Sequence, residues 1–130
     1  MSQFPPQFPA DAQGMAVAII VARYNSQVTE KLLAGAEQAL REANAEKVDV
    51  YTVPGAFELP LAAARLVEDY DAIVALGCVI RGETPHFDYV CAEAARGIQQ
   101  VGVETGVPVA FGVLTTDTLE LPPKGSRKPT

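Results

Sequence analysis

The sequence predicts an α/β fold in which four or more parallel strands form a sheet flanked by helices. Three continuous apolar segments, Ala16–Ala22, Ala72–Ile80 and residues 108–114, have the length of strands that are covered on both faces. Residues 48–53 form a fourth strand, in which apolar and polar side chains alternate. Segments with helical periodicity separate these strands, and this alternation favours a parallel sheet with right-handed crossovers.

An extended arm and a helix flank the first strand. The prolines of residues 1–14 exclude a helix there and favour extended backbone. Phe4 and Phe8 of this arm either dock on a neighbouring surface or belong to a frayed tail. After the strand, Thr29 opens a helix over residues 29–44, whose apolar side chains recur at helical spacing.

Two further helices follow the second and third strands. Residues 57–69 form the shorter one, with Pro60 tolerated in its first turn. Residues 81–85 are a loop, and residues 85–104 form the longer helix. Residues 115–120 then begin another helix after the last strand.

Composition and charge exclude several classes of protein. The chain has 130 residues, of which 48% are apolar, so we expect one globular domain. No apolar stretch approaches the roughly 18 to 20 residues of a membrane span, and the start does not resemble a signal peptide, so we expect a cytoplasmic protein with no membrane partner. The net charge of −6 argues against nucleic acid as a partner. Cys78 and Cys91 are expected to be buried, reduced thiols, and with one histidine they are too few for a metal site.

The chemically distinctive residues gather at the carboxyl ends of the predicted strands. These ends are residues 23–25, 54–56, 80–86 and 115–116. In a parallel sheet the ligand binds beyond this edge, which therefore holds the candidate site.

His86 is the only histidine and lies at the end of the third strand. Thr84 and Pro85 before it resemble an N-cap and a proline at the first helical position, which places His86 in the first helical turn. An imidazole can accept and return a proton near pH 7, so His86 is a candidate for proton transfer. The alternative is a structural or merely exposed histidine.

Two loops offer donors to a ligand. Gly82 lets backbone N–H groups approach a phosphate before the helix, with Thr84 adding a hydroxyl, although an ordinary connecting loop is the alternative. Arg81 either reaches that phosphate or pairs with surface acids. The turn at Gly55 aims N–H groups and the Glu58 carboxylate at a polyol, unless Glu58 is simply an acid in the first turn of a helix.

Two aromatic side chains, Tyr24 and Phe111, are candidates to flank a flat ring. Ordinary core packing is the alternative for both.

Four segments of the chain carry distinctive motifs, and they read ARYNSQVTEKLLAGAEQAL, VPGAFELP, ALGCVIRGETPHFDYVCAEAARGI and VPVAFGVLTTDTLE. In their order and spacing these segments resemble lumazine synthases. The resemblance implies a flavodoxin-like, three-layer fold over residues 15–120. It implies the penultimate reaction of riboflavin synthesis, in which 5-amino-6-(D-ribitylamino)uracil condenses with 3,4-dihydroxy-2-butanone 4-phosphate. The products are 6,7-dimethyl-8-ribityllumazine, phosphate and water, and no cofactor takes part.

The resemblance also implies roles for individual residues and a homo-oligomer. His86 corresponds to the proton-transfer residue, and Glu83 and Thr84 correspond to the loop that holds the butanone phosphate. The positions that correspond to the aminouracil site are Tyr24, Ala56, Phe57, Glu58, Cys78, Val79, Ile80 and Phe111. Phe111 corresponds to an aromatic side chain that enters the site from the adjacent subunit. The implied assembly is a pentamer or a sixty-subunit icosahedral shell, with riboflavin synthase as a further partner.

Residues 121–130 depart from this resemblance. They hold three of the ten basic side chains and no acid, so the rest of the chain carries a charge of −9. Pro122 and Pro123 interrupt the helix that the family continues into, and no residue of this basic tail matches the family's phosphate-binding arginine. We therefore expect weak binding of the butanone phosphate and impaired assembly; a fold-retaining, catalytically weak or inactive member is the alternative function.

Overall fold

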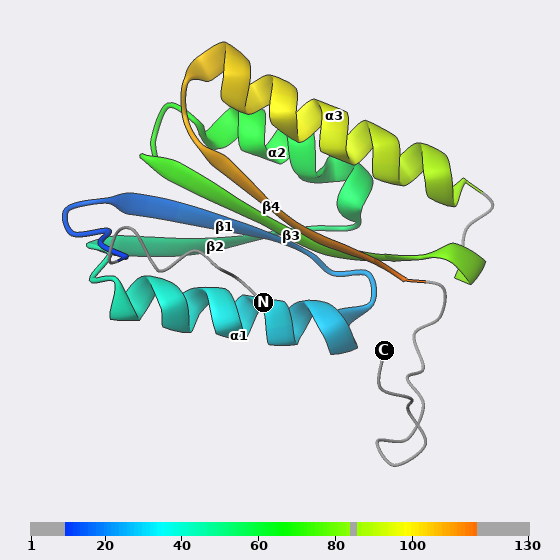
Figure 1. The fold of residues 1–130 in the computed structure, drawn as a ribbon, viewed down its shortest axis with the longest axis horizontal. Coiled ribbons are helices and arrows are strands. Elements are labelled where there is room, and N and C mark those ends of the chain that lie inside the picture. Colours follow the sequence, from blue (N-terminus) through cyan, green and yellow to red (C-terminus); the bar gives the residue numbers. More distant parts are fainter. Residues whose placement is uncertain (1–9, 84–85, 117–130) are drawn as a thin grey trace, which may run out of the picture.

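The computed structural model describes residues 10–83 and 86–116, and these form one α/β unit (Figure 1). Its four strands are β1 (Ala16–Ala22), β2 (Lys47–Val53), β3 (Ala72–Ile80) and β4 (Val109–Thr116). The strands are all parallel and lie in the order β2-β1-β3-β4. The predicted α/β class with a four-stranded parallel sheet is confirmed. The expected basic tail, residues 121–130, and residues 1–9 of the expected arm lie outside the described residues.

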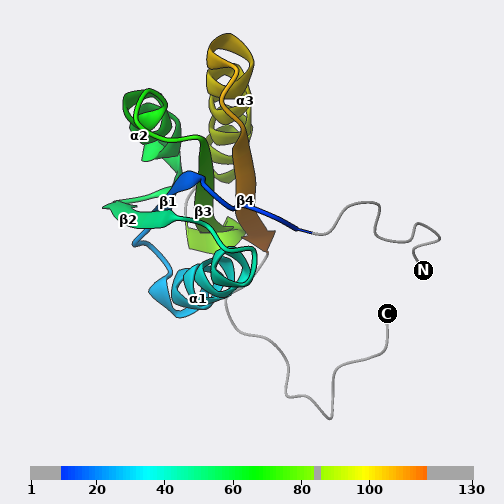
Figure 2. The ribbon, with the colours of Figure 1, turned by 90° about the vertical axis from the view of Figure 1, so that its left-hand side faces the viewer.

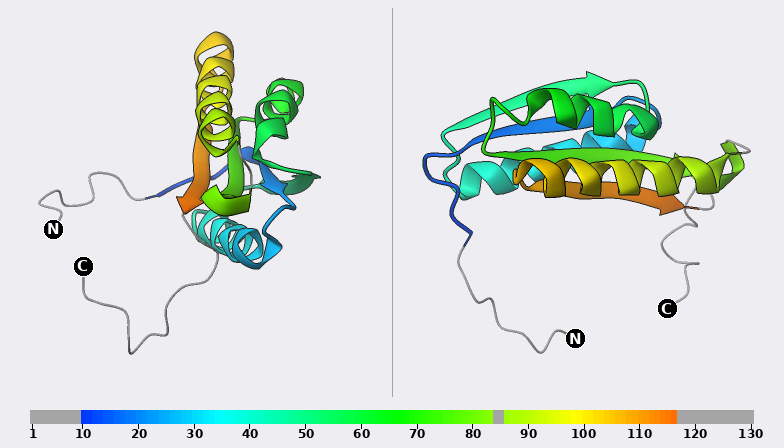
Figure 3. Two further views of the ribbon diagram at one scale, coloured as in Figure 1. Left: turned by 90° about the vertical axis from the view of Figure 1, so that its right-hand side faces the viewer. Right: turned by 90° about the horizontal axis from the view of Figure 1, so that it is seen from above.

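Helices cover both faces of the sheet and give three layers (Figures 2 and 3). One face carries α1 (Ser26–Glu42), and the other carries α2 (Leu59–Leu66) and α3 (Phe87–Thr105). Two short 3-10 helices, η1 (Ala56–Glu58) and η2 (Arg81–Glu83), follow β2 and β3. No helix in the described part of the chain is long and apolar enough to cross a membrane.

The core lies on both sides of the sheet because β1 and β3 are buried on both faces, as continuous apolar strands require. Ile20, Leu59 and Ile73 belong to the larger cluster, which α2 and α3 cover. Ile19 and Val21 point to the opposite face and pack with Leu76 under α1. The rigid sheet thus fixes where the carboxyl ends of its strands lie.

Three predicted helix starts differ from the observed starts by two or three residues. α1 begins at Ser26 and not at Thr29, because Asn25 adopts left-handed backbone (φ 63°) and its carbonyl accepts the first helical N–H groups. The expected helix over residues 57–69 is the 3-10 turn η1 followed by α2. α3 begins at Phe87, so His86 is the residue that precedes the helix and not a member of its first turn.

The last strand is longer than predicted. Thr115 and Thr116, where a helix was expected to begin, continue β4. They pair with Val79 and Ile80 at the end of β3, and this backbone pairing extends the strand beyond its apolar residues. Residues 117–120 lie outside the described part of the chain.

The described part of the N-terminal arm packs against the turn between α1 and β2. The Ala12 N–H donates to the Ala43 carbonyl at 2.7 Å, and Ala12 is buried. Gln13 forms an antiparallel bridge with Ala45. These residues therefore belong to the folded unit.

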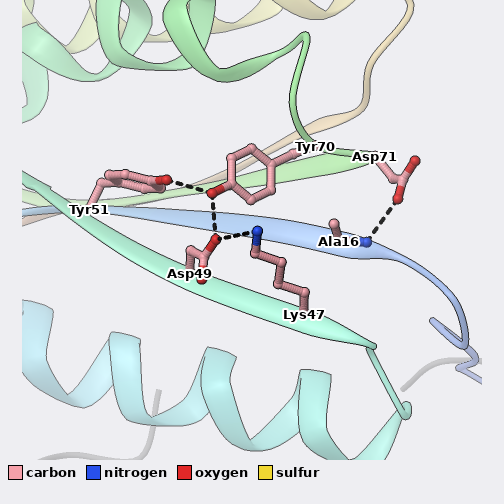
Figure 4. Close-up of polar contacts among 6 residues, drawn as sticks. All are labelled: Ala16, Lys47, Asp49, Tyr51, Tyr70 and Asp71. Carbon is pink, nitrogen blue, oxygen red and sulfur yellow. Dashed lines mark hydrogen bonds and ion pairs between the residues drawn. The ribbon is translucent and has the colours of Figure 1, made fainter.

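A polar network joins β2 to the turn before β3 (Figure 4). The hydroxyl of Tyr70 donates to the Asp49 carboxylate at 2.5 Å and lies 2.5 Å from the hydroxyl of Tyr51. Lys47 pairs with the same carboxylate at 3.5 Å. The hydrogen bond to Asp49, with smaller contributions from Tyr51 and burial, raises the pKa of Tyr70 well above its ordinary value of 10.0.

We expect this network to make stability fall at alkaline pH. Above pH 10 the unfolded chain releases the Tyr70 proton while the folded protein keeps it, so the free energy of unfolding decreases as pH rises. Urea unfolding of the wild type and Tyr70→Phe at pH 8 and pH 10.5 measures the effect. The difference in free energy of unfolding between the wild type and Tyr70→Phe should be smaller at pH 10.5 than at pH 8. Tyr24→Phe, a control outside the network, should lose as much stability between the two pH values as the wild type. An advantage of equal size at both pH values would contradict this account.

Candidate active site

A cavity of about 190 Å³ opens at the carboxyl ends of β1, β2 and β3. It lies where the chain leaves β1 for one face of the sheet and β2 for the other, which is the position expected for a ligand in this topology. Its lining is mainly apolar and comprises Tyr24, Gly55, Ala56, Phe57, Cys78, Val79, Ile80 and Val90. Six of the predicted aminouracil residues are therefore brought together, although they come from three separate parts of the sequence.

Backbone hydrogen bonds from the two residues after β1 to the end of β2 and the turn that follows it fix the position of Tyr24 in the cavity wall. The N–H of Arg23 donates to the Val53 carbonyl at 2.8 Å, and the N–H of Tyr24 donates to the Pro54 carbonyl at 3.0 Å. These bonds hold Tyr24 beside the turn that follows β2, with its side chain 59% exposed. A ring held in this way offers an open face for stacking.

Asn25 is a residue of the site that the sequence reasoning missed. Its side-chain amide donates to the carbonyl of Cys78 at 2.9 Å, which ties the end of β1 to the end of β3. Its left-handed backbone, which asparagine tolerates better than most residues, turns the chain from Tyr24 into α1. The signal that could have found this turn is an asparagine directly after the first strand.

Glu58 closes the turn after β2. Its Oε1 accepts a hydrogen bond from the Gly55 N–H at 2.8 Å. The Glu58 side chain lines a groove between β2 and α2 and is not among the residues that line the cavity. In this structure Glu58 thus acts as an acid in the first turn of a helix, which was the alternative to ligand binding. Its binding of the ribityl chain, the polyol of the aminouracil, stays a prediction.

His86 lines a second hollow, next to the first. This hollow has a volume of about 310 Å³ and is lined by Phe57, His86, Tyr89 and Val90. Phe57 and Val90 also line the first cavity, so these two side chains form a shared wall. The predicted proton-transfer residue therefore lies directly across this wall from the predicted ring site.

The loop between β3 and α3 is only partly described. Arg81 pairs with Asp88, with 3.7 Å between Nη1 and Oδ1, and its guanidinium lies 4.5 Å from the centre of the Phe87 ring. Pairing with a surface acid was one of its two predicted roles. Glu83 ends η2, and Thr84 lies outside the described residues, so their predicted contact with phosphate stays a prediction.

Phe111 is the third residue of β4, pairs with Ala75 and is 44% exposed. It does not line the cavity of its own chain. The idea that Tyr24 and Phe111 of one chain flank a ring is therefore not supported, while entry of Phe111 into a neighbouring site stays a prediction.

Neither cysteine forms a disulfide. Cys78 is buried, as expected, and lines the cavity; Cys91 is only half-buried, which corrects the expectation for it. Burial raises the pKa of the Cys91 thiol, and the nearby Asp88 adds to this effect. Among the described residues no group of three or more His, Cys, Asp or Glu side chains is placed to hold a metal ion.

Comparison with known proteins places this chain in a family. The family model described as 6,7-dimethyl-8-ribityllumazine synthase matches residues 14–122. The chain belongs to the 6,7-dimethyl-8-ribityllumazine synthase family. The synthase of that name from Kineococcus radiotolerans is 54% identical over 113 residues, which cover 86% of this chain and 70% of the relative. The one from Desulfatibacillum aliphaticivorans is 53% identical over 113 residues, which cover 84% of this chain and 73% of the relative.

Proposed function

We propose that this chain is a transferase that condenses 5-amino-6-(D-ribitylamino)uracil with 3,4-dihydroxy-2-butanone 4-phosphate to 6,7-dimethyl-8-ribityllumazine. Membership of the synthase family supports this activity. The observation in the structure that carries the proposal is the pair of hollows with one common wall at the carboxyl edge of the sheet. One hollow has an aromatic side chain suited to a flat ring, and the other has the histidine.

The arrangement suits a condensation in which the protein positions two reactants and each step also moves a proton. The 5-amino nitrogen attacks the ketone carbon, and loss of water gives a Schiff base. Removal of the proton on carbon 3 then expels phosphate from carbon 4 and leaves an enol, which becomes a ketone as carbon 4 takes up a proton. The ribitylamino nitrogen adds to this ketone and closes the ring with loss of a second water. We assign ring stacking to Tyr24 and proton transfer to His86, which returns its proton within the same turnover.

A homo-oligomer with shared sites is part of this proposal. The cavity of about 190 Å³ is smaller than the roughly 300 Å³ at which ordinary ligand pockets begin, so one chain alone offers an incomplete enclosure. The half-exposed Phe111 on the edge strand β4 is the side chain we expect to complete the site of a neighbour. We propose a pentamer in the cytoplasm; assembly into a sixty-subunit shell and association with riboflavin synthase extend the same proposal.

The test mixes the purified chain with both substrates and follows lumazine absorbance and phosphate release together. Equal amounts of lumazine and phosphate, with a native mass of five chains or a multiple of five, would support the proposal. A folded chain that binds the aminouracil but releases no phosphate would instead support the inactive alternative. Activity from a stable monomer would contradict the shared site.

A further inference from the structure

We infer that Tyr89 and Val90 are positioning residues that hold the aminouracil ring at a fixed distance from His86. This inference rests on the proposed function and assigns a separate role in it to each of the two residues. Both residues lie in the first turn of α3, and the sequence reasoning assigned no role to either. Both line the second hollow, which contains His86 and is called the His86 hollow below. Val90 also lines the first cavity, which is called the ring cavity because we expect the aminouracil ring to bind there.

Tyr89 acts through Phe57. The two rings stack with their centres 6.1 Å apart and their planes inclined by 28°. Phe57 is 50% exposed and sits in the short η1 turn, so few of its own neighbours restrict the ring. The Tyr89 ring, which comes from the other side of the wall, therefore limits how Phe57 turns toward or away from the cavity.

Val90 forms the more rigid part of the wall that the two hollows share. It packs against the main core cluster, and its N–H donates to the His86 carbonyl at 2.8 Å. A β-branched side chain in a helix keeps essentially one rotamer, so Val90 offers a nearly rigid surface to both hollows. The bond to His86 also fixes the histidine backbone relative to this surface. Val90 thereby sets how far a ring in the cavity can move toward the imidazole.

The exposed pair Phe57 and Tyr89 allows one competing interpretation, a docking surface for another protein. A docking surface would use the exposed edges of these two rings and would not need Val90, which is half-buried between the two hollows. The positioning role requires both Tyr89 and Val90, and it places the effect of Tyr89 in the KM for one substrate and the effect of Val90 in kcat. The two interpretations are therefore separable by kinetics.

The test compares Tyr89→Ala, Tyr89→Phe and Val90→Ala, with Val103→Ala as the matched control on the same helix. Val103 is 76% exposed and belongs to neither hollow. For Tyr89→Ala we expect the KM for the aminouracil to rise ~10-fold while the KM for the butanone phosphate stays within ~2-fold. Tyr89→Phe keeps the stacked ring and should restore wild-type values. Val90→Ala should lower kcat ~10-fold, because a loosened wall misplaces the ring relative to His86.

A readout without turnover keeps this test independent of the proposed activity. The Kd of 6,7-dimethyl-8-ribityllumazine itself, measured by titration calorimetry, should rise ~10-fold in Tyr89→Ala and stay unchanged in Tyr89→Phe and Val103→Ala. Equal effects of Tyr89→Ala and Tyr89→Phe, equal losses for both substrates, or lower melting temperatures with unchanged constants would overturn the inference. A wild-type chain that binds lumazine without turning over would contradict the proposed activity and leave the binding prediction to be judged on Kd alone.

Discussion

Changing His86 to alanine should lower kcat by ~10²-fold or more, which is the usual contribution of a positioned proton-transfer group. His86 is exposed at the edge of its hollow, and the hydrogen bond from Val90 uses its carbonyl, which alanine retains. The start of α3 should therefore form as before, and the free energy of unfolding should change little. Steady-state kinetics on both substrates, with urea unfolding beside them, measures the two effects separately.

The controls distinguish lost chemistry from lost structure. Added imidazole should restore part of the activity of His86→Ala, because a small base can enter a hollow of about 310 Å³. Asp88→Ala, two residues along and also exposed, removes a surface ion pair with Arg81 and should leave kcat within ~2-fold. Undiminished kcat in His86→Ala would exclude His86 as the proton-transfer group.

The fold was predictable because the central strands carry an unambiguous signal. β1 and β3 are flanked by a strand on each side and by helices on both faces, so nearly every side chain in them is apolar. The bounds of both strands agree with the prediction to the residue. β2 lies at the edge of the sheet and shows alternation instead, with Lys47 and Asp49 in a polar network on one face.

The loops were predicted less well because their conformations depend on single hydrogen bonds. Periodicity indicates that a helix follows β1, but the left-handed backbone of Asn25, whose carbonyl accepts the first helical N–H groups, sets where that helix begins. The same limit applies to Glu58, since a carboxylate in a first turn can face a ligand or its own backbone. The structure shows the backbone contact with Gly55, and the only sequence feature that favours it is the three-residue spacing of a capping box.

The composition of the site was more predictable than its geometry. Strand ends and family resemblance located the residues of the ring cavity, but neither could show that the cavity and the His86 hollow share a wall. That wall depends on the relative placement of η1 and α3, which are separated by 28 residues of sequence. Side-chain stacking such as that of Phe57 on Tyr89 is a tertiary property, and a helical pattern describes only the face on which Tyr89 lies.

Tyr24 should contribute to the binding of one substrate and not the other. In Tyr24→Ala we expect the Kd for the aminouracil to rise ~10-fold or more, while the Kd for the butanone phosphate stays near the wild-type value. A stacked aromatic pair contributes about 0.5–1.5 kcal/mol beyond the burial of its surface, and about 1.4 kcal/mol corresponds to tenfold in Kd. The ring is 59% exposed without ligand, so its removal costs little stability and the loss should appear in binding.

The Tyr24→Phe variant distinguishes the contribution of the ring to binding from that of the hydroxyl. Stacking uses the ring face, so the phenylalanine variant should bind the aminouracil within ~2-fold of the wild type. The backbone bond from residue 24 to the Pro54 carbonyl is retained in both variants, which keeps the loop in place and makes the comparison one of side chains alone. Calorimetric titration of each substrate into the three proteins gives the result. A parallel loss of affinity for both substrates in Tyr24→Ala would indicate a disturbed fold, and a large loss in Tyr24→Phe would show that the hydroxyl, and not the ring, recognises the substrate.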